Sequence, residues 1–169
     1  MGIQFGGMSY TTTVNSNSVQ NLANGSSTTS TLAGIYNAVS ITGGTYTFSN
    51  NTINNLTRLA GHTSGATYGL YTSNSTTNVI SFGNTISNIS TASTTSTGSF
   101  YGYYNFGSAN SGVENFYSNT VFNISQTSTS TGLTYGAYIA TGASAPFPTK
   151  QIYGNTIYNI SGGTGQTGA

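Results

Sequence analysis

The chain has 169 residues, only 2% of them charged, and a formal net charge of +1. Two basic side chains, Arg58 and Lys150, are too few to neutralise a run of phosphates, which argues against nucleic-acid binding, and no apolar run approaches the roughly 20 residues of a membrane-spanning helix. The absence of cysteine excludes disulfides and thiolate metal sites.

The first recurring element in chain order is a short segment in which glycine precedes an apolar and an aromatic residue. Its strong copies cover residues 68–71, 101–104 and 135–138, and weaker copies cover 2–5 and 34–36. The glycines stand at positions 2, 34, 69, 102 and 136, so the element returns every 32 to 35 residues. We call it the glycine segment.

A second apolar run, the middle segment, follows each strong copy. It covers residues 79–82, 113–117 and 151–153. Glu114 lies three residues before Tyr117, and Lys150 lies three residues before Tyr153. Glu114 and Lys150 are therefore predicted to be neighbours on adjacent turns, as a stacked and exposed ion pair.

The third element is the asparagine segment, which reads Asn-Thr-Ile-Ser-Asn-Ile-Ser at residues 84–90. It returns at 119–125 and 155–161, with earlier copies at 51–57 and, more worn, at 17–22. The leading asparagines stand at positions 17, 51, 84, 119 and 155, so this element keeps the same pace as the glycine segment.

Each period thus holds three short β-prone runs and a loop rich in Ser, Thr and Gly, which is typical of strands joined by turns. A period near 34 also suits two-helix repeats, but those need long amphipathic runs of Ala, Leu, Glu and Lys, which this chain lacks. The sequence predicts an all-β parallel β-helix, a solenoid with five turns of about 34 residues and three short strands per turn. It forms one domain, 1–169, with repeats at about 2–33, 34–68, 69–101, 102–135 and 136–169.

A single turn of this kind cannot bury its own apolar face, so the core must come from stacking. Because Ile86 and Ile89 are three residues apart, simple alternation cannot turn both inward; a corner at Asn88 solves this, since asparagine tolerates left-handed backbone conformations. Two inward columns are predicted, one of Ile53, Ile86, Val121 and Ile157 and one of Leu56, Ile89, Ile124 and Ile160. Stacked corners would align Asn55, Asn88, Asn123 and Asn159 as a hydrogen-bonded ladder.

The pattern Gly-Ile-Tyr, Asn-x-Ile and Asn-Thr-Ile-x-Asn-Ile resembles the right-handed parallel β-helix repeats of the pectin-lyase-like superfamily. It is most similar to the Ser/Thr/Asn-rich repeats of very large secreted or surface proteins of bacteria. The resemblance covers almost the whole chain and implies a right-handed winding. It is specific for fold and weak for function, because that superfamily hosts lyases, hydrolases, adhesins and scaffolds.

Catalysis is not expected. The enzymes that this fold resembles use carboxylates, and glycoside hydrolysis usually needs two of them flanking the bond. Glu114 is the only carboxylate side chain of this sequence. A calcium-assisted site would also need several Asp or Glu ligands, and we expect no cofactor.

Outward side chains are the candidate contact surface. If Ile35, Leu70, Tyr103 and Ala137 point inward, then strand alternation turns Tyr36, Tyr71, Tyr104 and Tyr138 outward. These rings could stack on sugar faces, or they could pack on each other, under the long loop or on a neighbouring chain. His62 is expected to be a solvated loop residue, since no second His, Cys or Asp supports a metal site. Arg58 is expected to cover surface or cap carbonyls.

The ends of the sequence suggest assembly. It opens in a glycine segment and closes with residues 162–169, which resemble the loop that elsewhere leads into a glycine segment. Complementary end faces make heterologous contacts that yield open filaments. We expect an extracellular or cell-surface structural protein that stacks head to tail with further copies of itself and does not insert into a membrane. Two alternatives stay open: a stretch of a longer adhesin or stalk, bounded by neighbouring solenoid repeats, or a carbohydrate-binding module that holds glycans on its tyrosine column.

Overall fold

A computed structural model describes residues 1–5, 10–24, 29–39, 43–74, 78–107, 112–127, 129–140 and 149–164. Residues 165–169, which belong to the tail compared above with a loop, lie outside this description. The described ranges contain fifteen strands and no helix.

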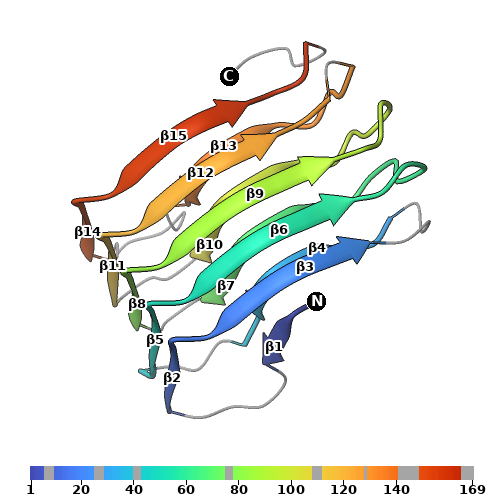
Figure 1. Ribbon diagram of the computed structural model, residues 1–169. Coiled ribbons are helices and arrows are strands. Elements are labelled where there is room, and N and C mark those ends of the chain that lie inside the picture. The colour runs from blue at the N-terminus through green and yellow to red at the C-terminus, as the bar shows by residue number, and fades with distance from the viewer. Residues whose placement is uncertain are drawn as a thin grey trace.

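The strands form three parallel sheets of five (Figure 1). The first sheet contains β1 (Ile3–Phe5), β4 (Leu32–Asn37), β7 (Thr67–Asn74), β10 (Phe100–Gly107) and β13 (Thr134–Ile139). The second contains β2 (Thr11–Asn15), β5 (Thr45–Ser49), β8 (Asn78–Phe82), β11 (Val113–Tyr117) and β14 (Thr149–Tyr153). The third contains β3 (Ser18–Asn24), β6 (Thr52–Arg58), β9 (Thr85–Thr91), β12 (Thr120–Ser125) and β15 (Thr156–Ser161).

Neighbouring strands in each sheet come from successive turns of the chain, which makes the molecule a β-solenoid with three strands per turn. In Figure 1 the third sheet faces the viewer, the first sheet lies behind it and the second sheet closes the left side. The layers rise from the N-terminus at the bottom to the C-terminus at the top, so the winding is right-handed. The predicted fold class is confirmed, but the predicted five turns are not. The chain returns to the first sheet four times after leaving β1 and makes about four turns.

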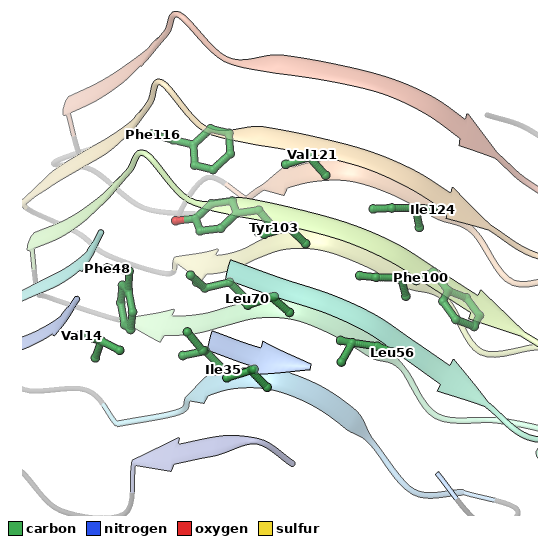
Figure 2. Close-up of a cluster of buried hydrophobic side chains, with 14 of the residues drawn as sticks. Val14, Ile35, Phe48, Leu56, Leu70, Phe100, Tyr103, Phe116, Val121 and Ile124 are labelled. Carbon is green, nitrogen blue, oxygen red and sulfur yellow. The ribbon is translucent and has the colours of Figure 1, made fainter. Parts of the chain in front are cut away.

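Equivalent apolar side chains lie directly over one another. The pairing register places Ile53, Ile86, Val121 and Ile157 in one column and Leu56, Ile89, Ile124 and Ile160 in another. Within the described chain all of them except Ile157 join one continuous core, in which side chains from all three sheets meet (Figure 2). Ile86 is 0% exposed, whereas Ile157, at the end of the same column, is 45% exposed because β15 is the last described strand of its sheet.

The predicted corner inside the asparagine segment is a left-handed residue within a continuous strand. Asn88 has φ of 55°, and Asn21, Asn55, Asn123 and Asn159 adopt the same conformation. This kink breaks the alternation of the strand, so both Ile86 and Ile89 face the interior.

A second corner, between the second and third sheets, was not predicted. Its residue has positive φ in every turn, at Ser16, Asn50, Gly83, Ser118 and Gly154. Because this residue varies between Ser, Asn and Gly, it carries no repeated sequence signal. It delivers the leading asparagine of the next segment to the interior edge, where Asn51, Asn84 and Asn119 are almost fully buried.

The recurring glycine of the glycine segment is explained by the short distance between the first and third sheets. A Cβ on Gly69 would lie 2.4 Å from Cγ2 of Ile86 and 2.5 Å from the carbonyl oxygen of Gly102. A Cβ on Gly102 would lie 2.4 Å from Cγ1 of Val121 and 2.5 Å from the carbonyl oxygen of Gly136. The first and third sheets therefore approach so closely that no larger residue fits at this position.

The loops after the third sheet also stack in layers. Ala92 N–H donates to the carbonyl oxygen of Arg58 at 2.7 Å, and Thr97 N–H donates to that of Thr63 at 2.8 Å. One turn further on, Thr131 N–H donates to the carbonyl oxygen of Ser96 at 3.2 Å. The Ser/Thr/Gly insertions thus extend the solenoid sideways.

The depth of a residue along the axis should decide its contribution to stability. We expect Ile86→Ala to lower the free energy of unfolding by about 2–5 kcal/mol, as buried large-to-small substitutions do. Ile157→Ala, in the same column but half exposed, should cost less than half as much in dilute monomeric protein. Urea unfolding followed by circular dichroism measures both, and equal losses would contradict the layered core.

Candidate functional site

Neither a pocket nor a cluster of three or more His, Cys, Asp or Glu side chains forms among the described residues. Across the same ranges, no helix is long and apolar enough to cross a membrane. What the solenoid does carry are ladders of identical side chains and two end layers with unlike properties.

The predicted asparagine ladder runs along the outside of the third sheet in two pieces. Asn159 Nδ2 donates to Asn123 Oδ1 at 3.1 Å, and Asn123 Nδ2 donates to Asn88 Oδ1 at 3.0 Å. Asn88 Nδ2 then turns to Asn54 Oδ1, at 2.7 Å, instead of to Asn55. Asn55 Nδ2 donates to Asn21 Oδ1 at 2.7 Å, so the ladder resumes one position away.

A second ladder, which sequence reasoning missed, is buried. Its members are the leading residues of the asparagine segments: Asn17, Asn51, Asn84, Asn119 and Asn155. At the centre, the backbone N–H and the Nδ2 of Asn84 donate to Asn119 Oδ1 at 3.0 and 2.9 Å. Asn84 Nδ2 also donates to the carbonyl oxygen of Phe48, one turn below, at 2.9 Å. The strict recurrence of these asparagines was the available signal.

The buried ladder has a direction. In each step the N–H and Nδ2 of one layer donate to the Oδ1 of the next layer toward the C-terminus. At the last layer Asn155 Nδ2 donates to the carbonyl oxygen of Phe116, and its backbone N–H has no acceptor among the described residues. At the first layer Asn17 Oδ1 accepts no hydrogen bond from a described residue.

The two end layers also differ in their apolar exposure. Val14 and Ile152 occupy one column of the second sheet, and Val19 and Ile157 occupy one column of the third. Val14 and Val19 are only 5% and 7% exposed, whereas Ile152 is 54% exposed. The C-terminal layer therefore presents open apolar column ends, and the N-terminal layer presents largely covered ones.

The predicted partners Glu114 and Lys150 lie side by side in β11 and β14, with Nζ 2.9 Å from Oε2. Their predicted exposure is wrong, because Glu114 is buried and Lys150 only slightly exposed. Glu114 Oε1 also accepts a hydrogen bond from Asn105 Nδ2, and Lys150 Nζ donates to the carbonyl oxygen of Ala140. The single carboxylate side chain is thus held in a local polar cluster.

Arg58 and His62 are both fully buried, so the predictions of a surface arginine and a solvated histidine are wrong, whereas the alternative that Arg58 caps a carbonyl agrees with the structure. The guanidinium of Arg58 lies 5.1 Å from the centre of the Phe100 ring and donates to the carbonyl oxygen of Gly65. Burial lowers the pKa of Arg58 to about 10. His62 Nε2 lies 3.0 Å from the carbonyl oxygen of Ser30, and burial, with Arg58 as the second cause, lowers the pKa of His62.

Arg58 belongs to a column of loop fillers that differ from turn to turn. Its register partner in the next turn is Thr91, which accepts a hydrogen bond from Ser93 N–H at 2.9 Å. One turn further on, Gln126 Nε2 donates to the carbonyl oxygen of Leu133 at 3.0 Å. Each buried polar side chain ties its own loop to the solenoid.

The tyrosines of the first sheet form one array of two stacked columns. Tyr36, Tyr71, Tyr104 and Tyr138 stack with ring centroids 4.5, 5.4 and 5.1 Å apart. Tyr68, Tyr101 and Tyr135 form the second column, at 5.3 and 5.2 Å. The columns touch within each strand, as at Tyr101 and Tyr104, whose centroids are 4.6 Å apart. Desolvation raises the pKa of Tyr104 to about 12.

Two shorter aromatic stacks run along the other faces: Phe82, Tyr117 and Tyr153 on the second sheet, and Phe122 and Tyr158 on the third. Comparison with protein-family models, curated protein sequences and solved structures finds no match to this chain.

Substitutions in the two asparagine ladders should differ sharply in how much they lower the free energy of unfolding. Asn84→Ala leaves the buried backbone N–H of Asn51 without its acceptor and the carbonyl oxygen of Phe48 without the Nδ2 donor, at roughly 1–3 kcal/mol each, so we expect a loss near 3 kcal/mol. Asn88→Gly removes an exposed ladder member but keeps the left-handed conformation, and should cost under about 1 kcal/mol. Urea unfolding compares them; a larger loss for Asn88→Gly would refute this ranking.

The buried histidine makes stability fall on acidification. Its pKa is lowered in the folded protein, so below the ordinary value of about 6.5 the unfolded chain binds the proton more strongly. Stability should therefore drop from pH 7 to pH 5, by up to about 1.4 kcal/mol per pH unit. His62→Gln should remove this slope, since it is the only histidine. Urea midpoints across this range, with an NMR titration of His62, test the sign.

Proposed function

We propose that this chain is an extracellular structural protein whose copies stack head to tail into a fibre or surface filament, so that the solenoid continues across each junction. The observation that carries the proposal is the complementarity of the two end layers. The C-terminal layer presents a backbone donor without a described acceptor, and the N-terminal layer presents an acceptor without a described donor. Both groups belong to the column of asparagines that joins the internal layers.

The hydrogen-bonding groups match first. Asn155 has a backbone N–H without a described acceptor, and Asn17 has an Oδ1 without a described donor. Seating Asn17 of one copy over Asn155 of another repeats the contact that Asn84 makes with Asn119. The outer ladder runs in the opposite sense, and Asn21 Nδ2 would donate to Asn159 Oδ1 as Asn159 Nδ2 donates to Asn123.

The apolar columns of the C-terminal layer give a second argument. Ile152 and Ile157 are open column ends, about half exposed, which a second copy would cover, whereas Val14 and Val19, which begin the same columns, are already nearly buried. The sheet edges would also be paired, which removes a hazard that natural proteins otherwise blunt with charges, prolines or bulges. β1, β2 and β3 contain no charged residue. The one charge in the C-terminal layer, Lys150, is paired with Glu114.

Such a contact joins two different faces and does not close on itself, so it leads to an open filament. The extracellular placement rests on composition and on the resemblance to Ser/Thr/Asn-rich repeats of the pectin-lyase-like superfamily in secreted bacterial proteins. The surface consists mainly of hydroxyls and amides, with 2% charged residues. Copies could therefore pair along such a fibre without a cofactor or a counter-ion.

A longer adhesin or stalk solenoid, with these layers flanked by repeats of the same chain, would use the same complementarity. The carbohydrate-binding alternative has less support. Sugars stack on the faces of aromatic rings, and the faces of the tyrosine array are covered by neighbouring rings.

Electron microscopy of the purified chain tests the filament. We expect uniform threads with an axial repeat of about 24 Å per copy, since each copy contributes five layers at about 4.8 Å. Ile157→Lys, which places a charge on the C-terminal face, should abolish them. Leu59→Lys is the matched control, because Leu59 is 43% exposed, almost as much as Ile157, but lies in a loop of the second layer, outside both end layers.

Short monodisperse rods from the unmodified chain, at every concentration, would overturn the filament and favour the longer solenoid. Threads that survive Ile157→Lys would show that the contact lies elsewhere.

A further inference from the structure

The tyrosine array concentrates the oxidisable side chains of this protein. The sequence has no Cys and no Trp and only two Met, against 13 Tyr. Seven of these tyrosines lie in the array on β4, β7, β10 and β13. An oxidant that removes single electrons therefore finds phenols as its main target, and most of them lie in one continuous cluster.

The array places phenols of successive turns in direct contact. Tyr68 and Tyr101 are 5.3 Å apart between ring centroids, Tyr101 and Tyr135 are 5.2 Å apart, and Tyr71 and Tyr104 are 5.4 Å apart. Each of these pairs joins two neighbouring turns. The array tyrosines are partly exposed, and Tyr138, at the C-terminal end, is the most open. An oxidant in solvent can therefore reach the array.

We propose that the tyrosine array is an oxidative cross-linking site, in which one-electron oxidation of the peroxidase type joins tyrosines of successive turns as dityrosine. Each of two phenols loses one electron and one proton and becomes a phenoxyl radical. The radicals couple through ring carbons ortho to oxygen, and the two displaced ring hydrogens return to the oxygens. For each bond, one hydrogen peroxide takes up the two electrons and two protons and becomes two waters.

Proximity decides which tyrosines couple. Coupling needs two radicals in contact, and in dilute protein two chains seldom meet in that state. Within the array a radical has phenol neighbours at about 5 Å, so coupling there is intramolecular, with the high effective concentration of groups held side by side. Tyr10 and Tyr158 are more exposed than most of the array, but within the described chain neither stacks on another tyrosine ring. Outside the array, Tyr117 and Tyr153 form a further stacked pair, with ring centroids 5.0 Å apart.

The consequence is a covalent link along the solenoid axis. The chain has no cysteine and so cannot form disulfides across its turns. Dityrosine between β7 and β10, or between β10 and β13, would tie neighbouring layers together. The proposal applies to a single copy and does not rest on filament formation.

The test treats the full chain with peroxidase and hydrogen peroxide. Dityrosine is read by its fluorescence in the single-chain band of a denaturing gel, and the linked peptides, lighter by two hydrogens, are assigned by mass spectrometry. We expect peptides that join residues 67–74 to 100–107, or 100–107 to 134–139, and an increased resistance of the treated protein to urea.

Two triple variants remove equal numbers of phenols. Tyr71→Phe with Tyr101→Phe and Tyr104→Phe keeps the ring stacking but removes a phenol from every recorded contact between turns of the array. Its dityrosine between turns of the array should fall to the level of untreated protein, whereas linkage of Tyr117 to Tyr153 and of Tyr135 to Tyr138, whose phenols it keeps, can remain. Tyr10→Phe with Tyr153→Phe and Tyr158→Phe removes three exposed phenols outside the array, and with them the stacked Tyr117–Tyr153 pair, and should leave the yield of array-linked peptides unchanged.

The opposite ranking of the two variants, or linkage mainly between chains through Tyr10, Tyr153 or Tyr158, would overturn the proposal. Circular dichroism and urea midpoints before treatment show whether each variant is folded. A folded array variant that cross-links within the chain as well as the unmodified protein would also refute it.

Discussion

The strands, the apolar columns and the asparagine ladders depend on one constraint, which is that each layer must present matching groups to the next layer in the same register. The buried asparagine ladder shows this most clearly. Asn84 receives two donors from Asn51 below and gives two donors to Asn119 above, and its Nδ2 also donates to the backbone carbonyl of Phe48 one turn below. A polar side chain so deeply buried is tolerated only because its partners recur at every turn.

The same constraint shapes the apolar interior. The first and third sheets lie so close that glycine must face isoleucine or valine across the core. Buried aromatic side chains lie on either side of this contact: Phe100 packs against Arg58 on the loop side, and others lie on the side of the second sheet. Tyr103 and Phe116 meet there with ring centroids 4.3 Å apart. A narrow cross-section buries little area per turn, so stability must accumulate from layer to layer. Because stability accumulates in this way, the layers of this chain join into one continuous core without disulfides and with few charged side chains.

How much of this could be predicted depends on whether a residue repeats. The columns of Ile86 and Ile89 and the kink at Asn88 could be predicted, because spacing and residue type recur in every copy. The corner at Gly83 could not, because backbone conformation is conserved along the stack while the residue changes. The burial of Arg58 and His62 was missed for a related reason. Each occurs once, and composition alone made a charged loop residue look like surface, whereas stacked loops have an interior of their own.

The column of loop fillers has a consequence for folding. Layers built to the same plan are nearly interchangeable, so a chain of this kind can misfold by pairing a strand with the wrong turn, shifted by a whole repeat. Arg58, Thr91 and Gln126 differ in length and in the hydrogen bonds that they need, and each fits the loop of its own turn. A shift by one repeat would bury a guanidinium where a hydroxyl belongs. These three side chains therefore distinguish one turn from the next. They make strand pairings shifted by a whole repeat less stable than the correct pairings.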